Sequence, residues 1–191
     1  MIEIDANSPV TDPEFSAWAR EMYDLLGSNM TSILGHDGPD WRTDDEFRKW
    51  EKGVLLDGLG KGTIYLLLLD GQGLRGFLSF SAPPTVTEIY MNEIQIRVSS
   101  RKDGVTFRRL TEGFAARIAD LPQTSVQTYA NRRNEDSHKL IRKAGFSLHS
   151  QTERGARFIA SKAMVLAKFK TRRQNNQIQP IARQERAQAD S

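Results

Sequence analysis

Apolar residues in the first sixty positions recur every three or four residues, which is the spacing of one face of an α-helix. The first run follows Asp12-Pro13, a capping residue and a first-turn proline, and we expect this helix to end at Gly27. A second helix is predicted from Thr43, with acidic residues in its first turn. Both helices would bury their apolar face in the core. The apolar positions are Phe15, Trp18, Ala19, Met22, Leu25 and Leu26 in the first helix and Phe47, Trp50, Val54 and Leu55 in the second.

After residue 60 the pattern becomes that of β-strands. Residues 63–69 and 74–81 are strand-like runs joined by Asp70-Gly71-Gln72-Gly73, a strong hairpin signal. A third strand is predicted over residues 87–98, where alternate residues would lie on opposite faces. One face would carry Ile94, Ile96 and Val98, and the other Glu93, Gln95 and Arg97.

The second half of the chain alternates between helix and strand signals. A helix is predicted after Gly104, followed by a short strand over residues 125–130. Asn134 would cap a further helix through Lys143, and Gly145 stands where a helix end favours a positive φ. Phe146 would begin another strand, and residues 164–169 would form the last one. The order of these elements predicts a mixed α/β fold.

Composition excludes several classes of protein. The 191 residues, 38% hydrophobic and 27% charged, suit one soluble globular domain, and no apolar run is long enough to cross a bilayer. The chain has no cysteine, which excludes disulfides, thiolate metal sites and a cysteine nucleophile. The three histidines, His36, His138 and His149, lack metal-ligand spacing. We therefore expect a cytoplasmic protein that has no metal and does not bind membranes.

Charge divides the chain into three parts, with net charges of −8 for residues 1–60, +7 for residues 61–167 and +4 for residues 168–191. This division indicates a polyanionic cofactor and a cationic second ligand, although solvated helix faces are an equal alternative. The C-terminal residues 170–191 are basic and rich in Gln, and we expect a disordered tail. No aromatic residues accompany its cations, so nucleic acid is the weaker hypothesis for a partner.

The stretch SRKDGVTFRR, residues 100–109, stands between a predicted strand and a predicted helix. In such a turn the unpaired amides of the first helical turn can point at an anion, and nearby guanidinium groups assist. The stretch lacks the Gly-Lys-Ser/Thr of a P-loop and the three glycines of a dinucleotide fingerprint. Taken alone, it is compatible with a phosphate site or with a plain strand-helix turn.

A second stretch, NEDSHKLIRKAGF at residues 134–146, follows one helix and one strand later. Together the two stretches resemble the GNAT family, the acetyl-CoA-dependent N-acetyltransferases. The first resembles that family's pyrophosphate loop, and the second its asparagine helix ending in Gly-Phe. The matching positions are Arg101, Gly104 and Thr106 in the loop and Asn134, Ser137, Gly145 and Phe146 in the helix. The resemblance covers residues 5–169 and implies one domain, residues 1–169, with a mostly antiparallel central sheet flanked by helices.

The resemblance also implies where acetyl-CoA would bind. Backbone amides of the loop would cradle the pyrophosphate, from Lys102, Asp103, Gly104, Val105, Thr106 and Phe107. Arg101, Lys102, Arg108 and Arg109 would add positive charge. The backbone of Ile96 and Val98 would pair with the acetyl carbonyl and the pantetheine arm, and Asn134 would bind that arm across two splayed strands. The acetyl group would then be held for direct attack by an amine.

Two residues depart from the family's pattern. Thr106 replaces a small residue where the backbone should approach phosphate closely, although its hydroxyl could donate to an oxygen. Ile141 replaces the tyrosine that often protonates the leaving thiolate. For the general base, Glu93 and Tyr129 are the candidates, each against the alternative of a purely structural role, and His138 is weaker than both. Two functions therefore remain: an N-acetyltransferase acting on a primary, cationic amine, or a catalytically silent GNAT-like module that works as a binding protein.

Overall fold

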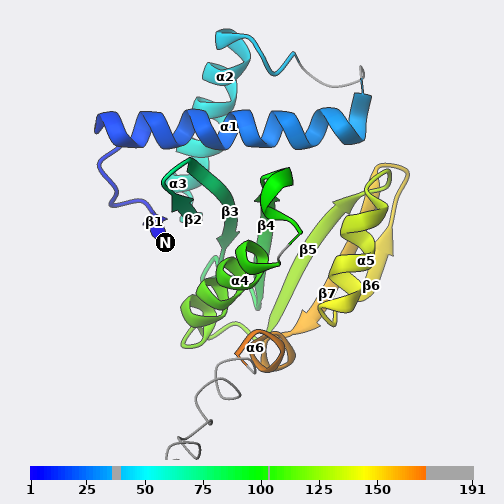
Figure 1. Ribbon diagram of the computed structural model, residues 1–191. Helices are drawn as coiled ribbons and strands as arrows, with labels where there is room; N and C mark the ends of the chain where they lie inside the picture. Colours follow the sequence, from blue (N-terminus) through cyan, green and yellow to red (C-terminus); the bar gives the residue numbers. More distant parts are fainter. Residues whose placement is uncertain (36–39, 103, 171–191) are drawn as a thin grey trace, which may run out of the picture.

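The computed structural model describes residues 1–35, 40–102 and 104–170, and these residues form a seven-stranded sheet flanked by helices (Figure 1). The strand order is β1-β2-β3-β4-β5-β7-β6, and all neighbours are antiparallel except β4 and β5. A single domain with a mixed, mostly antiparallel sheet is thereby confirmed. The strands are β1 (Ile2–Ile4), β2 (Ile64–Asp70), β3 (Gly73–Ser81), β4 (Glu88–Ile96), β5 (Ser125–Asn131), β6 (Ser147–Gln151) and β7 (Gly155–Ser161).

The helices lie on both faces of this sheet, and none in the described part of the chain has the length and apolar character that a bilayer span requires. The α-helices are α1 (Pro13–Leu34), α2 (Asp44–Trp50), α3 (Asp57–Gly60), α4 (Val105–Ile118), α5 (Glu135–Lys143) and α6 (Lys162–Lys170). A π-helical segment, Glu51–Leu56, joins α2 to α3, and a 3-10 turn, Val98–Ser100, precedes α4. The expected tail lies outside the described residues, apart from Lys170 at the end of α6.

The first helix begins as predicted and ends later than predicted. Asp12 caps α1 by accepting from the amide of Glu14, but the helix continues past Gly27 to Leu34. Gly27 is needed for packing, since a Cβ atom there would lie 2.7 Å from Cβ of Trp41. The C-cap is instead Gly35, with a φ of 61°. A glycine that admits a neighbouring ring was thus mistaken for one that ends a helix.

Two apolar cores form because each strand alternates its side chains between the faces of the sheet. On one face α1 and α2 pack over residues such as Tyr65, Leu67 and Phe77. On the other face α4 packs over Leu66 and Leu78, and the same core continues under α5 and α6. The sheet therefore has an α1 face and an α4 face.

The end of the described chain differs from the prediction. Residues 164–169 lie in α6, not in a strand, and the last strand is β7, which the sequence pattern did not reveal. The run Met164-Val165-Leu166-Ala167 is apolar and short, and such runs do not distinguish a strand from a buried helix by periodicity. Residues 155–161 contain glycine and alanine where bulkier strand residues are usual, which concealed β7.

The start of α4 approaches β3 closely, because β3 has a glycine at the contact. A Cβ atom on Gly76 would lie 2.6 Å from the carbonyl oxygen of Gln95 and 3.1 Å from Cγ2 of Thr106. Thr106 is completely buried there, with its methyl group against Gly76. The β-branched residue that departs from the GNAT pattern therefore lies on the inner side of the helix, where Gly76 makes room for it.

This contact predicts that Gly76→Ala destabilises the fold by about 1–3 kcal/mol, since the added methyl must displace backbone in a packed core. Gly60→Ala is the matched control, because Gly60 is helical and a Cβ atom there would meet nothing within 4 Å. Urea unfolding of both variants measures the difference. Equal stabilities of the two would show that α4 does not approach β3 as described.

Candidate functional site

The two parallel strands at the centre of the sheet separate after their first residues. β4 and β5 pair from Glu88 with Ser125 as far as Met91 with Thr128. Beyond this point the strands diverge, as Figure 1 shows for the upper halves of β4 and β5. The separation opens the sheet on the side of β4 that faces away from β3.

A β-bulge accompanies the separation. Phe80 of β3 pairs with Met91 and its neighbour Ser79 pairs with Glu93, so that Asn92 is the extra residue. Beyond the bulge, the alternation of β4 side chains between the two faces of the sheet is shifted by one residue. Met91 and Ile94 both belong to the α4 face, whereas Gln95 bonds to Asn29 of α1 and so lies on the α1 face.

The end of β4 presents backbone groups that β3 does not use. The amide of Arg97 donates to the carbonyl of Arg75 on β3 at 2.8 Å. Because neighbouring residues of a strand point their backbone groups in opposite directions, those of Ile94 and Ile96 point away from β3. The carbonyl of Ile96 instead accepts from Arg101 Nε at 3.1 Å and Asn29 Nδ2 at 3.3 Å. Val98, which was expected to continue the strand, is 62% exposed in the 3-10 turn.

The loop between β4 and α4 ends at a glycine that begins the helix. Gly104 is the N-cap of the 14-residue helix α4, with a φ of 64° that favours glycine, and it has no side chain with which to cap the helix. A Cβ atom on Gly104 would meet nothing within 4 Å, so its outer side is open. The N-terminus of α4 at Gly104 is thus the kind of helix terminus that can bind anions. Asp103 lies outside the described residues.

The cations of this loop have different surroundings. Lys102 and Arg109 are exposed beside the helix terminus. Arg101 turns back toward the sheet, where Nη2 donates to Oδ1 of Asn29 at 2.6 Å and Nε donates to Ile96. Arg101 therefore holds the loop against β4 and α1. The hydroxyl of Thr106 is buried without a hydrogen-bond partner, so it does not face an anion at the loop surface.

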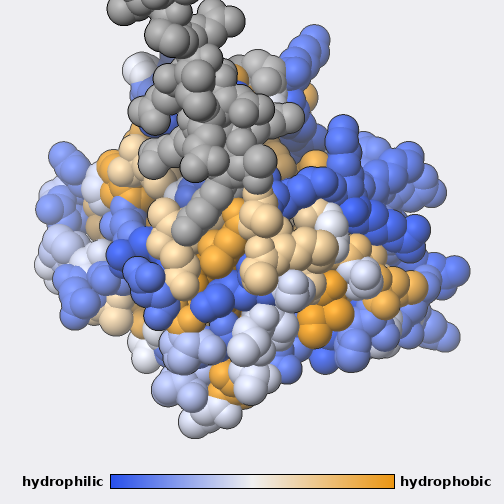
Figure 2. Space-filling model, turned by 90° about the horizontal axis from the view of Figure 1, so that it is seen from below, coloured by the Kyte–Doolittle hydropathy of each residue, from blue (hydrophilic) through white to orange (hydrophobic). Residues whose placement is uncertain are grey.

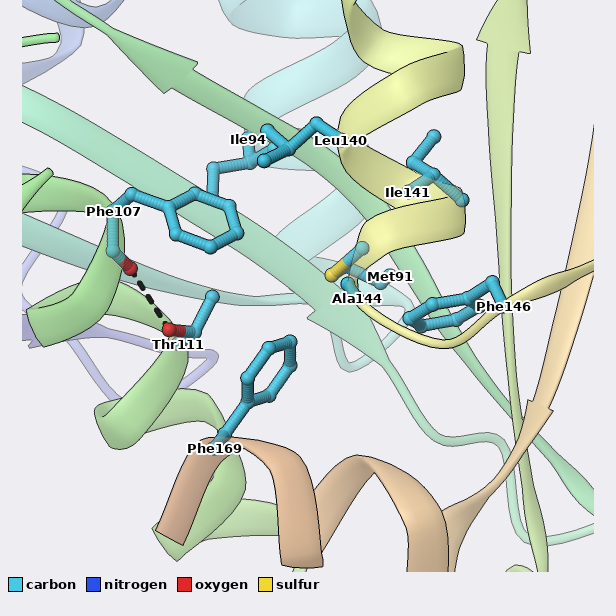
Figure 3. A pocket seen from close by; sticks show the side chains of 9 residues that line it. All are labelled: Met91, Ile94, Phe107, Thr111, Leu140, Ile141, Ala144, Phe146 and Phe169. Carbon is cyan, nitrogen blue, oxygen red and sulfur yellow. Dashed lines mark hydrogen bonds between the residues drawn. The ribbon is translucent and has the colours of Figure 1, made fainter. Parts of the chain in front are cut away.

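An apolar pocket lies between α4 and α5 on the α4 face of the opened sheet (Figure 3). Figure 3 shows Phe107, Ile94 and Leu140 around its upper part and Phe169 of α6 below. The ring of Phe169 makes an edge contact with Phe107, with centroids 6.4 Å apart. The remaining lining residues are Met91, Thr111, Ile141, Ala144 and Phe146. On the molecular face seen from below in Figure 2, hydrophobic surface gathers in the middle and hydrophilic surface lies to the right.

The asparagine helix forms one wall of this pocket. Asn134 caps α5 by accepting from the amide of Ser137 at 3.0 Å, as predicted for a capping residue. At its other end Gly145, with a φ of 98°, and Phe146 donate to the carbonyls of Arg142 and Ile141, which closes the helix. Ile141 is buried and lines the pocket, so no hydroxyl is available at that position.

His138 is partly buried beside the sheet. Its Nε2 lies 3.0 Å from the carbonyl oxygen of Asn131, and its ring packs edge-on against Phe158. These contacts hold the ring against the end of β5 and against β7. Of the candidate bases, His138 is therefore engaged in packing between α5 and the sheet.

Glu93 is half-buried on the α1 face of β4, where burial partly desolvates its carboxyl group. This desolvation raises the pKa of Glu93 to about 7, and a hydrogen bond from Gln95 acts in the opposite direction. Burial also raises the pKa of Tyr65 on β2, and the charge of Glu93 adds to that shift. A carboxyl group with such a pKa exchanges protons near neutral pH, as a general base must.

Tyr129 lies on the same face of the sheet as Glu93, since its neighbours Thr128 and Ala130 are buried and Ala130 belongs to the α4-face core. It is 51% exposed, and its hydroxyl lies over Gly155 of β7, where a Cβ atom would be 2.3 Å from it. Tyr129 thus leans toward β7. Within residues 1–35, 40–102 and 104–170, no three His, Asp or Glu side chains gather as a metal site.

Sequence reasoning missed Asn29, Gln95 and Phe169 as parts of this region. Asn29 comes from the part of α1 beyond its predicted end, and Phe169 from a segment expected to be a strand. Gln95 is an ordinary strand residue in the sequence, and only its bonds to Asn29 and Glu93 distinguish it. No local pattern connects positions 29 and 95.

The arrangement defines a class of fold, in which a mixed sheet opens between two central parallel strands beside the N-terminus of a helix. Neither a family model nor a curated protein sequence matches the chain. Solved structures do match, and they identify the fold as that of the GNAT acetyltransferases. Three of these structures are 8–15% identical to this chain in sequence, so the likeness is one of fold.

Three matches illustrate the likeness. The PaiA N-acetyltransferase from Thermoplasma acidophilum, in complex with coenzyme A, has a TM-score of 0.63 at 11% identity, over 84% of this chain and 99% of that chain. An acetyltransferase of the GNAT family from Staphylococcus aureus Mu50 has a TM-score of 0.60 at 8% identity, over 84% and 98%. Spermidine N-acetyltransferase from Vibrio cholerae, in complex with CoA and spermine, has a TM-score of 0.58 at 15% identity, over 78% and 93%.

The raised pKa of Glu93 predicts how stability depends on pH. Between about 4.5 and about 7, the folded protein holds a proton on Glu93 that the unfolded chain releases. The free energy of unfolding therefore falls as pH rises through this interval, and Glu93→Gln removes that contribution. We expect the variant to gain stability relative to wild type between pH 5 and pH 8 in urea unfolding. The control is Glu153→Gln, on the exposed turn between β6 and β7. A constant difference between Glu93→Gln and wild type would contradict the desolvation of Glu93.

Proposed function

We propose that this protein is an acetyl-CoA-dependent N-acetyltransferase, with one catalytic domain over residues 1–169. The observation that carries the proposal is the junction of β4 and α4. There the edge of β4 at Ile94 and Ile96, which β5 leaves unpaired, lies next to the N-terminus of α4 at Gly104. A strand edge can pair with an amide-containing arm, and a helix terminus can bind a pyrophosphate. Acetyl-CoA has both groups, joined in one molecule.

The residues present fit each part of that ligand. The open outer side of Gly104 and the exposed cations Lys102 and Arg109 suit the phosphates. The apolar pocket between α4 and α5 suits the aliphatic part of the arm, and Asn134 caps α5, the helix that forms one wall of this pocket. Ser137 lies in the first turn of α5, and its backbone amide donates a hydrogen bond to Oδ1 of Asn134. The CoA complexes among the structural neighbours support this assignment.

Acetyl-CoA supplies a thioester, whose carbonyl carbon is open to attack by an amine. An acceptor that arrives as an ammonium ion must first lose a proton, and Glu93 is the base best suited to take it near pH 7. The new bond joins the amine nitrogen to the acetyl carbon, and the bond to sulfur breaks. Ile141 provides no proton for the leaving thiolate, so positioning carries much of the rate.

The acceptor is proposed to be a primary, cationic amine: a small molecule, a peptide N-terminus or a lysine. The acidic first third of the chain supports this choice, since it would attract cations toward the α1 face. One structural neighbour, a spermidine N-acetyltransferase, was solved with spermine and is consistent with an amine acceptor. The alternative is a catalytically silent GNAT-like module, which would bind CoA weakly or not at all, acetylate no amine and work as an interaction protein.

Acetyl-CoA should stabilise the folded protein. At about a hundredfold excess over Kd the gain is about 2.7 kcal/mol, which raises the melting temperature. Gly104→Val should abolish this increase, because a branched side chain would intrude where the phosphates bind. Gly62→Val is the matched control, since Gly62 also has a positive φ, 83°, and open space around it, but lies between α3 and β2. If acetyl-CoA at millimolar concentration leaves wild type unchanged, the cofactor assignment is wrong.

Glu93→Gln should lower kcat for amine acetylation about a hundredfold or more at pH 7, the usual loss for a general base. Tyr129→Phe should have a small effect, because its hydroxyl lies over Gly155. Steady-state rates over a panel of polyamines, peptides and lysine analogues measure both. A larger loss in Tyr129→Phe would make tyrosine the base. Binding of acetyl-CoA with no turnover across the panel would favour the silent module.

A further inference from the structure

A chain of hydrogen bonds crosses the interior from the cofactor loop to Glu93. Arg101 donates to Oδ1 of Asn29 at 2.6 Å, and Asn29 donates through Nδ2 to Oε1 of Gln95 at 2.8 Å. Gln95 in turn donates through Nε2 to Oε1 of Glu93 at 3.2 Å. These hydrogen bonds connect the loop before α4, the middle of the sheet and α1, which are far apart in the sequence.

The chain has a fixed direction, because its first member can only donate. A guanidinium group has no acceptor, so Asn29 must present its oxygen to Arg101. The amide nitrogen of Asn29 then serves both Gln95 and the carbonyl of Ile96. Gln95 must accept at its oxygen, which leaves its nitrogen to donate to Glu93. A reversed amide at either position would set donor against donor.

Burial makes this direction costly to disturb. Asn29 is 4% exposed and Gln95 is 8% exposed, so water does not readily replace a lost partner. An unpaired buried polar group is strongly disfavoured, and members of a polar network reinforce one another. The two amides are therefore held as donors toward Glu93 for as long as Arg101 stays in place.

We propose that Asn29 is a positioning residue, which together with Gln95 links the placement of Arg101 in the cofactor loop to the orientation and charge state of Glu93. The inference rests on the proposed function in taking Glu93 as the base and Arg101 as part of the CoA site. Neither Asn29 nor Gln95 touches the reacting atoms in this arrangement. They keep one oxygen of Glu93 occupied and leave the other for the acceptor.

The surroundings of Glu93 limit the other influences on it. Gln95 faces it from its own strand, Ser79 pairs with it from β3, and Tyr65 is the ionisable neighbour from β2. From α1 the described contact to this group of residues is Asn29 itself. Loss of the Asn29 bond would free the Gln95 amide and weaken its donation to Glu93, which raises the pKa of Glu93 further.

A titration of Glu93 tests the link without any assay of activity. Carboxyl carbons of 13C-labelled glutamate are followed by NMR in wild type and Asn29→Leu, with Glu93→Gln to assign the signal. We expect Asn29→Leu to raise the Glu93 pKa by about 0.5 to 1 pH unit, the equivalent of one hydrogen bond. The control Thr31→Ala removes only a bond within α1, to the carbonyl of Gly27, and should leave the pKa unchanged. An unchanged pKa in folded Asn29→Leu overturns the proposal.

Arg101, at the other end of this series of hydrogen bonds, gives a second variant, which is expected to fold because Arg101 is exposed. Arg101→Leu should raise the Glu93 pKa more than Lys102→Leu does, although both remove one positive charge from the loop. Equal shifts would mean that only charge is felt at Glu93, and would overturn the proposal even if Asn29→Leu does not fold.

Kinetics then separate positioning from packing. Asn29→Leu should lower kcat about fivefold with little change in KM for acetyl-CoA, and should have no further effect in a Glu93→Gln background. Equal losses in both backgrounds would indicate a structural role and contradict the proposal. If no amine is turned over, the proposed function fails, and the titration alone decides whether Asn29 positions Glu93.

Discussion

The early end of pairing between β4 and β5 is the constraint on which the rest of the site depends. A parallel pair that continued past Met91 and Thr128 would satisfy the backbone of Ile94 and Ile96 within the sheet. Because the strands part, the sheet has a free edge at its centre, where other groups can reach it. The bulge at Asn92 accompanies this separation of the strands, and because of it Met91 and Ile94 both line the pocket while Glu93 faces α1.

A free edge at the centre of a sheet requires other contacts to hold its two sides together. Gly76 lets α4 approach β3 until Thr106 fills the space between them, so the helix terminus stays next to the open edge. Arg101 and Asn29 bond to the carbonyl of Ile96, which would otherwise lack a partner. The polar groups that complete the backbone in this region are thus the same ones that connect the loop to Glu93.

The sequence was sufficient to predict most of the helices and strands and the mixed α/β class of the fold. Caps and turns that act locally were predicted well, such as Asn134 and Gly145 at the two ends of α5. Errors arose where a residue's role is set by a distant contact: Gly27 admits Trp41, and Thr106 packs on Gly76. The candidate loop and base could be proposed from the sequence because each depends on residues that are close together in the chain. Asn29 and Gln95 were not, because their chemistry depends on two segments that meet only in the folded chain.

The proposed reaction has two proton transfers, one from the amine and one to the leaving thiolate. The hydrogen-bonded side chains around Glu93 favour the first, and the apolar pocket does not favour the second. Burial near Glu93 favours the protonated carboxyl, whereas donation from Gln95 favours the carboxylate, and their balance leaves a group that can accept a proton near pH 7 and release it again. The pocket side carries Ile141 and Leu140, which neither donate a proton nor solvate a thiolate. A thiolate formed there is destabilised by its surroundings. The proposed reaction is therefore favoured when the sulfur lies toward the open edge of β4, where a proton from Glu93 or from water can reach it. The β4–α4 junction must then hold the thioester in that position.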